Sequence, residues 1–563
     1  MRPPRICAVL LLTVLQRAWG ASSGPVVFTK SGYVMGKTDI VFNRPVDAFL
    51  GVPFAEPPLR ELRFKTPQAV KPWDGIYNAK EKPFPCLQHD TFVTKSVTID
   101  ASNSTEDCLY LNLWTPALHC NNIESCSSKS VMVFLYGGGF DTGGNSYFFY
   151  DGAHLAALGD VLVVVPNYRL GIFGFMNIGH PDAPGNMGLY DQLLALEWIK
   201  ENIVYFGGDP DSITLMGQSA GAMSIGFHMV SPLSRGLFHR AILESGSPYL
   251  LQPSNIKADI TRAEQLAFEV GCASENTTLF SHRHEVMECM SWVNGSMIMA
   301  ANKNLNEVHS ASFFPSYGDE FLPEDPRVAI ERGEFADIDL IIGTNRNEGS
   351  PFVNYFLTKF LKQDDPGSIS KDEVRFYLTM LFRYVLGISS KEIPDHYLKN
   401  IKDGDGTKAL TRAADAIGDF LFQCPVHYFA DRVAARNNTV YVYHFDHRPS
   451  YSWWDDWLGV AHFDEHFFVF GTLFQMAGYS TVEELDFSSK LIRAWTTFAR
   501  KGRLPKIRGR KWPKYSKQTP VFVNLSRGNF SVGLSTREEN CRVWDDIITV
   551  TPSEFDSYVD TVY

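Results

Sequence analysis

Residues 212–224 read SITLMGQSAGAMS, and this stretch decides which fold the chain can adopt. The apolar run 212–216 is typical of a buried strand, and 222–229 is typical of a helix. Between them Ser219 lies at the centre of G-x-S-x-G, with Gly217 and Gly221 on either side. A serine on so sharp a turn takes a strained backbone conformation, and side chains at 217 and 221 would collide with the neighbouring strand or helix. The sequence therefore predicts a strand–turn–helix unit that lifts a serine hydroxyl clear of a sheet edge.

A second glycine motif, YGGGF at 136–140, follows the apolar run 131–135. Bare glycine amides there suit an oxyanion hole, and the alternatives are a plain flexible loop or a phosphate cradle. No Lys-Ser/Thr pair follows, as a phosphate-binding P-loop would require. The Ser219 motif alone also has a structural interpretation, because a glycine-lined turn can open an ordinary helix. Together the two motifs indicate serine-dependent acyl transfer.

Buried strands alternate with amphipathic helices in the N-terminal half of the chain. The strand-like runs are VMVFLY at 131–136, VLVVV at 161–165 and SITLM at 212–216, with a helical pattern at 188–203. This alternation predicts a mostly parallel sheet with helices on both faces. After about residue 250 the pattern loosens, although 338–342 and 439–445 look like further strands. No Pro/Gly/Ser-rich linker separates the halves, so we predict a single domain over 21–563 with large insertions.

The N-terminus has the pattern of a secretory signal peptide. MRPPR at 1–5 is followed by the apolar run 6–15 and by AWG at 18–20, a small-x-small cleavage site. The apolar run is too short to span a bilayer, and Arg17 disfavours the alternative of an uncleaved anchor. We expect removal of residues 1–20 and secretion. No other stretch is long and apolar enough to predict a transmembrane helix.

Charge, cysteines and glycosylation sequons fit an extracellular protein. The formal net charge is −11, whereas nucleic-acid binding needs clustered Lys and Arg, so none is predicted. Outside the signal, an even number of cysteines is available for disulfides: Cys86, Cys108, Cys120, Cys126, Cys272, Cys289, Cys424 and Cys541. Asn-X-Ser/Thr sequons occur at Asn103, Asn276, Asn294, Asn437, Asn524 and Asn529. The sequence has no HExxH, CxxC pair or dinucleotide fingerprint, so neither metal nor organic cofactor is predicted.

Besides the two glycine motifs, the chain has further sequence blocks that resemble those of type-B carboxylesterases and cholinesterases. The resemblance runs from about Phe49 to about Trp544. These blocks are FLGVPFAEPP (49–58), EDCLYLNLWTP (106–116), NYRLGIFGF (167–175), PGNMGLYDQ (184–192), FHRAILESGSP (238–248), GTNRNEG (343–349) and GVAHFDEHFFVFG (459–471). The resemblance implies an α/β-hydrolase fold, with a large, mostly parallel central sheet flanked by helices and carrying insertions. It also implies hydrolysis of small-molecule carboxylic esters.

The resemblance supplies the partners of Ser219. It implies Glu348 as the acid and His462 as the general base, which accepts the serine proton and returns it to the leaving alcohol. It also implies oxyanion donors at Gly138, Gly139 and Ala220. Taken singly, Glu348 would be read as a surface carboxylate and His462 as a structural histidine, and His466 is a nearby competitor for the role of base.

The family pattern also implies disulfide pairs. These pairs are Cys86–Cys108, Cys272–Cys289 and Cys424–Cys541. Cys120 and Cys126 would then form a local fourth bridge in an extra loop.

Departures from the family pattern narrow the range of substrates that we expect. The loop between Cys86 and Cys108 has no tryptophan to bind a quaternary ammonium. Gln218 replaces the usual glutamate beside the serine, and His309, Ala311 and Pro351 stand where aromatics are expected. We therefore predict non-choline esters as substrates.

Two alternative functions stay open, and one substitution near the predicted base could reduce activity. GQSAG is also the variant of juvenile hormone esterases, and a non-catalytic, cholinesterase-like adhesion protein can use the same scaffold. Phe463 stands where the family has glycine after the histidine, and its ring would either crowd the imidazole or line the pocket.

Overall fold

The computed structural model describes residues 24–94, 97–99, 101–116, 118, 128–250, 256–309, 313–357, 369–385, 388, 391–476, 478–506, 509, 511–534 and 538–549. The predicted signal peptide, Cys120, Cys126 and Ala311 lie outside these residues. Among the helices that the structure describes, none combines the length and apolar character needed to span a bilayer.

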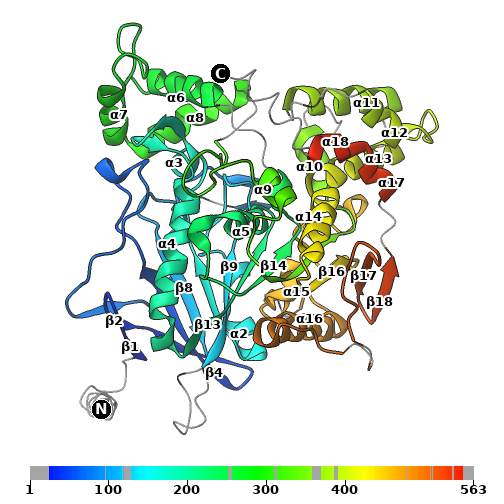
Figure 1. The fold of residues 1–563 in the computed structure, drawn as a ribbon, viewed down its shortest axis with the longest axis horizontal. Helices are drawn as coiled ribbons and strands as arrows, with labels where there is room; N and C mark the ends of the chain where they lie inside the picture. Colours follow the sequence, from blue (N-terminus) through cyan, green and yellow to red (C-terminus); the bar gives the residue numbers. More distant parts are fainter. Residues whose placement is uncertain are drawn as a thin grey trace.

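Eleven strands form one mixed sheet in the order β18-β17-β16-β15-β14-β13-β9-β10-β8-β4-β3 (Figure 1). The strands are β3 (Lys37–Val41), β4 (Arg44–Pro53), β8 (Tyr110–Thr115), β9 (Lys129–Leu135), β10 (Leu162–Pro166), β13 (Gly208–Gln218), β14 (Arg240–Glu244), β15 (Asp339–Asn345), β16 (Val440–Phe445), β17 (Val521–Ser526) and β18 (Asn529–Leu534). Neighbouring strands from β10 to β17 pair in parallel, and the pairs beyond them at both edges are antiparallel. The predicted large, mostly parallel sheet is confirmed.

Helices cover the sheet, and its central strands are therefore buried along almost their whole length. Every residue of β10 is buried, as is the VMVFL part of β9. Helices α2 (Ala153–Gly159) and α16 (Val482–Lys501) contact each other and the sheet, and α5 (Ala220–Val230) and α14 (Cys424–Ala435) pack on its central and later strands. Among the described residues, a hydrophobic core cluster includes buried side chains from Val27 to Ile548. The single domain over 21–563 stays a prediction.

Large insertions separate the later strands. Between β14 and β15 lie α6 (Ile256–Glu269), α7 (Arg283–Trp292), α8 (Gly295–His309) and α9 (Pro326–Arg332), and between β15 and β16 lie α10 (Ser350–Leu357), α11 (Lys371–Met380), α12 (Glu392–Leu398), α13 (Gly406–Gly418) and α14. Figure 1 shows α6–α8 and α11–α13 at the top of the view, above the sheet. The loosened sequence pattern after residue 250 therefore corresponds to helical insertions.

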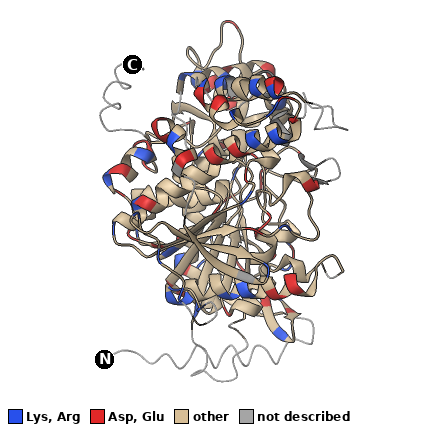
Figure 2. Cartoon of the chain, turned by 90° about the vertical axis from the view of Figure 1, so that its right-hand side faces the viewer, with Lys and Arg blue, Asp and Glu red and all other residues tan. Residues whose placement is uncertain are grey.

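Three disulfides stabilise the described fold, and most of the glycosylation sequons lie on its surface. The structure joins Cys86 to Cys108, Cys272 to Cys289 and Cys424 to Cys541, the three pairs that the resemblance implied. The side chains of four sequon asparagines are exposed: Asn103, Asn276, Asn294 and Asn437. Asn524 instead lies half-buried in β17, where its Nδ2 is 3.5 Å from Asp446 Oδ2. Figure 2 shows basic and acidic residues mixed along the helices. The prediction that the chain does not bind nucleic acid stays a prediction.

Candidate active site

Ser219 lies at the turn between β13, which ends at Gln218, and α5, which begins at Ala220. Its φ of 56° and ψ of −124° place it in the strained region that the motif predicted, at a typical cost of about 1–3 kcal/mol. A β carbon at Gly221 would lie 1.9 Å from the Leu135 carbonyl oxygen, and one at Gly217 would lie 2.6 Å from the Gly221 carbonyl carbon. Both glycines are therefore required by close packing around the turn.

The glycine loop after β9 lies directly beside Ser219. A β carbon at Gly137 would be 2.8 Å from Ser219 Cβ, so only glycine allows this approach. Gly138 and Gly139 have φ values of 119° and 62° and are exposed. Among the described residues no acceptor is recorded for the amides of Gly138, Gly139 or Ala220. These N–H groups are the oxyanion donors that the family resemblance predicted, and that of Ala220 also belongs to the positive end of α5.

His462 and Glu348 meet although they are far apart in sequence. His462 Nδ1 is 2.6 Å from Glu348 Oε2. Their loops are tied together, because the Asn347 N–H donates to the Val460 carbonyl at 2.9 Å. Glu348 is 1% exposed, so its interpretation as a surface carboxylate is wrong. The His462 ring stacks on Phe422 with centroids 4.3 Å apart, which fixes its plane.

Gln218 contacts the ring atom that a general base uses. Its Nε2 lies 3.2 Å from His462 Nε2. Since Nδ1 donates its proton to Glu348, Nε2 carries the lone pair and accepts from the Gln218 amide. The hydrogen bonds of the described residues include none between the Ser219 hydroxyl and His462. In this arrangement the Gln218 amide occupies the lone pair that a general base would offer to the serine hydroxyl. Apart from the position of Gln218 next to Ser219, no sequence pattern indicated this contact.

Phe463 does not cover the imidazole. Its φ is 82°, and its ring stacks on His466 at 4.6 Å and meets Phe149 at 5.5 Å. No ring contact between Phe463 and His462 occurs among the described residues. His466 Nε2 donates to the Phe149 carbonyl at 2.8 Å, and burial lowers its pKa to about 3. His466 is therefore a structural histidine and not a competing base.

A second buried carboxylate lies behind Glu348. Ser245 Oγ is 2.6 Å from Glu348 Oε1 and 3.5 Å from Glu465 Oε1, and Asn345 Nδ2 also donates to Glu465. Burial, followed by the charge of Glu348, raises the pKa of Glu465 to about 7, against smaller opposing effects of His462 and Asn345. Burial likewise raises the pKa of Asp464.

The raised pKa of Glu465 predicts a pH-dependent loss of stability. Between the ordinary value of 4.5 and about 7 the folded protein binds more protons at this group than the unfolded chain does. Stability that Glu465 contributes is thus complete below pH 4.5 and is lost as the pH rises to about 7, by up to about 3 kcal/mol. We therefore expect the free energy of unfolding of Glu465→Gln, relative to that of the wild type, to increase as the pH rises over this range. Chemical-denaturation curves at pH 5, 6 and 7.5 measure it. Glu483→Gln, an exposed control on α16, should track the wild type, and parallel curves for Glu465→Gln would contradict the prediction.

The chain is similar to known proteins over most of its length. Residues 23–544 match the model of the carboxylesterase family. The chain is 37% identical over 556 residues to acetylcholinesterase-1 of Trittame loki, covering 97% of this chain and 99% of the relative. It is 34% identical to an acetylcholinesterase of Leptinotarsa decemlineata and 35% identical to a cholinesterase of Mus musculus, covering 93% and 92% of this chain and 86% of each relative.

The family match accounts for the fold and for the class of reaction. The mixed sheet flanked by helices is that of the α/β-hydrolase fold. Within the described residues no group of three or more His, Cys, Asp or Glu side chains is arranged to hold a metal ion. The chain belongs to the carboxylesterase family and is an enzyme of its kind, a serine hydrolase of carboxylic esters.

Proposed function

We propose that Ser219 is the nucleophile, His462 the general base and Glu348 the acid of a secreted carboxylic ester hydrolase. The observation that carries this proposal is the 2.6 Å contact between His462 Nδ1 and Glu348 Oε2, with the other ring nitrogen turned toward the Gln218–Ser219 turn. Ser219 Oγ attacks the ester carbonyl while His462 Nε2 takes its proton. The proton then passes to the leaving alcohol, and water activated by His462 hydrolyses the acyl-enzyme.

The oxyanion formed during both steps is bound by the amides of Gly138, Gly139 and Ala220. Their exposure beside Ser219 and the lack of a recorded acceptor support this role. For the attack to begin, the Gln218 amide yields the lone pair of His462 Nε2 to the serine hydroxyl. Loss of one oxyanion donor typically costs about 10²–10³ in turnover.

We propose non-choline esters as the substrates, although the relatives above are named as cholinesterases. The Gln218 side chain at the base is a neutral amide, and the loop from Cys86 to Cys108 has no tryptophan. His309 ends α8, and Pro351 is buried at the start of α10, where the family has aromatics. A panel of choline, methyl, aryl and long-chain esters tests this: dominant turnover of choline esters would refute it. The juvenile hormone esterase-like subclass predicts a preference for hydrophobic methyl esters.

The family match favours the enzyme over the alternative of the sequence analysis, a non-catalytic binding protein on the same scaffold, which would rest on a single contact. His462 Nε2 is engaged by Gln218, with no recorded bond to the Ser219 hydroxyl. The two candidates are separated by assaying the secreted protein on a short aryl ester, with and without a serine-directed organophosphate. Hydrolysis that the organophosphate abolishes supports the esterase, and neither turnover nor labelling supports the binding protein.

Secretion and glycosylation are part of the same proposal. The disulfides of the structure suit an oxidising compartment, and the exposed sequons Asn103, Asn276, Asn294 and Asn437 are the proposed glycan sites. Asn524 is half-buried and faces Asp446, so we expect it to carry less glycan. N-terminal sequencing and glycopeptide mapping of the secreted chain test these points: a mature chain that retains residues 1–20 would refute the signal peptide.

Gln218→Glu should change both the pH profile and the substrate preference. A carboxylate at His462 Nε2 stabilises the protonated ring, so the acidic limb of kcat/KM moves to higher pH. The added negative charge should also raise the preference for a choline ester over its uncharged analogue by roughly tenfold. Gln475→Glu is the control, because this exposed glutamine also contacts a histidine ring, His154, on the surface. An unchanged pH profile and ester ratio in Gln218→Glu would contradict the prediction.

A further inference from the structure

Gln88 makes a two-point contact with the loop that carries the proposed oxyanion donors. Its Nε2 donates to the Gly143 carbonyl at 2.5 Å, and its Oε1 accepts the Gly143 N–H at 2.8 Å. The second hydrogen on Nε2 goes to the Cys86 carbonyl at 2.9 Å. Gln88 is 5% exposed, so water does not replace these bonds easily. The side chain thus holds the two peptide groups on either side of the Gly143 α carbon.

Gly143 in turn lies against the start of the glycine loop. A β carbon at Gly143 would be 2.5 Å from Tyr136 Cδ2 and 2.8 Å from the Gly137 carbonyl oxygen. The Gly138 carbonyl accepts the N–H groups of Asp141 at 3.1 Å and Thr142 at 3.0 Å. Residues 137–143 therefore form one closed loop, and fixing Gly143 fixes the loop.

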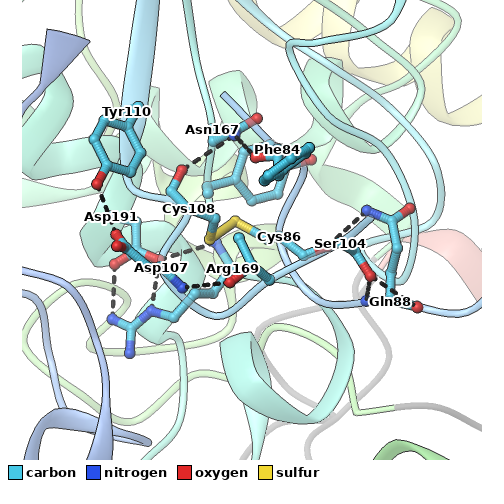
Figure 3. Close-up of a disulfide and its surroundings, with 12 residues drawn as sticks. Phe84, Cys86, Gln88, Ser104, Asp107, Cys108, Tyr110, Asn167, Arg169 and Asp191 are labelled. Atoms are coloured by element: carbon cyan, nitrogen blue, oxygen red, sulfur yellow. Dashed lines mark hydrogen bonds and ion pairs between the residues drawn. A yellow bond between two sulfur atoms is a disulfide. The ribbon is translucent and has the colours of Figure 1, made fainter. Parts of the chain in front are cut away.

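The other end of the contact is anchored in a rigid part of the molecule. Figure 3 shows Gln88 beside the Cys86–Cys108 disulfide, with Ser104 next to its backbone and Asn167 bonded to the Cys108 carbonyl. Asn167 Oδ1 also accepts the N–H of Asn145, two residues beyond Gly143, at 2.8 Å. The disulfide loop and the glycine loop are thus joined by two buried amide side chains.

We propose that Gln88 is a positioning residue, which holds loop 137–143 so that the amides of Gly138 and Gly139 face the reacting carbonyl at Ser219. The proposal rests on the function proposed above. Gln88 touches neither substrate nor Ser219 and acts through Gly143 and Gly137. A displacement of about 1 Å in such a loop is enough to cost on the order of 10² in rate.

Gln88→Leu tests this role, because it keeps the volume of the side chain and removes its hydrogen bonds. We expect the acylation rate constant at saturating aryl ester, measured by stopped flow, to fall by about 10–100-fold, with the apparent dissociation constant of the ester changed less than about threefold. Affinity for a trifluoromethyl ketone, which forms an oxyanion on Ser219, should fall in parallel. Asn202→Leu is the control: it removes a buried amide that bonds Trp198 and Lys30, remote from the glycine loop, and should leave both values unchanged.

Gln88→Glu provides a readout that does not depend on the folding of the leucine variant. Its carboxylate still accepts the Gly143 N–H but donates to the Gly143 carbonyl only when protonated. The ratio of its kcat/KM to that of the wild type should therefore rise as the pH falls. An unchanged acylation rate and ketone affinity in Gln88→Leu, or a ratio for Gln88→Glu that is independent of pH, overturns the inference. A wild-type protein without hydrolysis or labelling overturns the proposed function itself.

Discussion

Ser219→Ala should lower kcat/KM for a short aryl ester by about 10⁶, to a level set by binding and the oxyanion donors alone. The reason is that Ser219 carries the hydroxyl at the turn between β13 and α5, where the glycine loop and the Gln218–His462 contact also lie. Removing the proposed nucleophile leaves water as the attacking group. Steady-state hydrolysis by the purified protein, at high enzyme concentration to register the residual rate, measures the effect.

Ser212→Ala is the matched control for this variant. Ser212 lies on the same strand, β13, and its hydroxyl pairs with Ser130 instead of approaching His462. Loss of activity in Ser212→Ala comparable to that in Ser219→Ala would point to a general disturbance of β13. Retention of most activity in Ser219→Ala would remove Ser219 from the reaction.

Glu348→Gln should lower kcat/KM by about 10⁴. Glu348 Oε1 accepts the Asn345 N–H at 2.6 Å and the Ser245 hydroxyl at 2.6 Å. Because both groups are donors, the amide oxygen of the glutamine variant occupies the position of Oε1. The amide nitrogen then faces His462 Nδ1 and donates to it. The ring proton is forced onto Nε2, which can no longer take the proton of Ser219.

The matched comparison for Glu348→Gln is Glu465→Gln. Glu465 shares the Ser245 hydroxyl but not the contact with His462 Nδ1, so its loss in kcat/KM should be far smaller. Circular dichroism of both variants checks that the fold is kept. Equal rates for Glu348→Gln and the wild type would show that Glu348 does not set the tautomer of His462.

The turn at Ser219 and the central sheet were predictable from local sequence, because each depends on neighbours within a few residues. The apolar run before Gly217 predicts β13, and the collisions at Gly217 and Gly221 explain why only glycine fits there. Glu348 and His462 came only from the family resemblance. Nothing in their local spacing indicates that two loops after β15 and β16 meet through the Asn347–Val460 hydrogen bond.

Two features of the site could not be predicted from the sequence, because both depend on side-chain directions in the folded chain. Gln218 was recognised as a missing charge, but its contact with His462 Nε2 requires the strand end and the His462 loop to be placed together. Phe463 was expected either to crowd the imidazole or to line the pocket. Phe463 has a positive φ, and its ring contacts His466 and Phe149, with no ring contact to His462 among the described residues. It therefore does not crowd the imidazole, and a role in lining the pocket stays a prediction.

The most direct test of the account is to locate the covalent adduct of a serine-directed organophosphonate by peptide mass mapping of the wild-type protein. We expect one adduct per chain, on Ser219, formed slowly or not at all in His462→Ala. A protein that takes up no label, or takes it up at a different serine at the same rate in both forms, would contradict it.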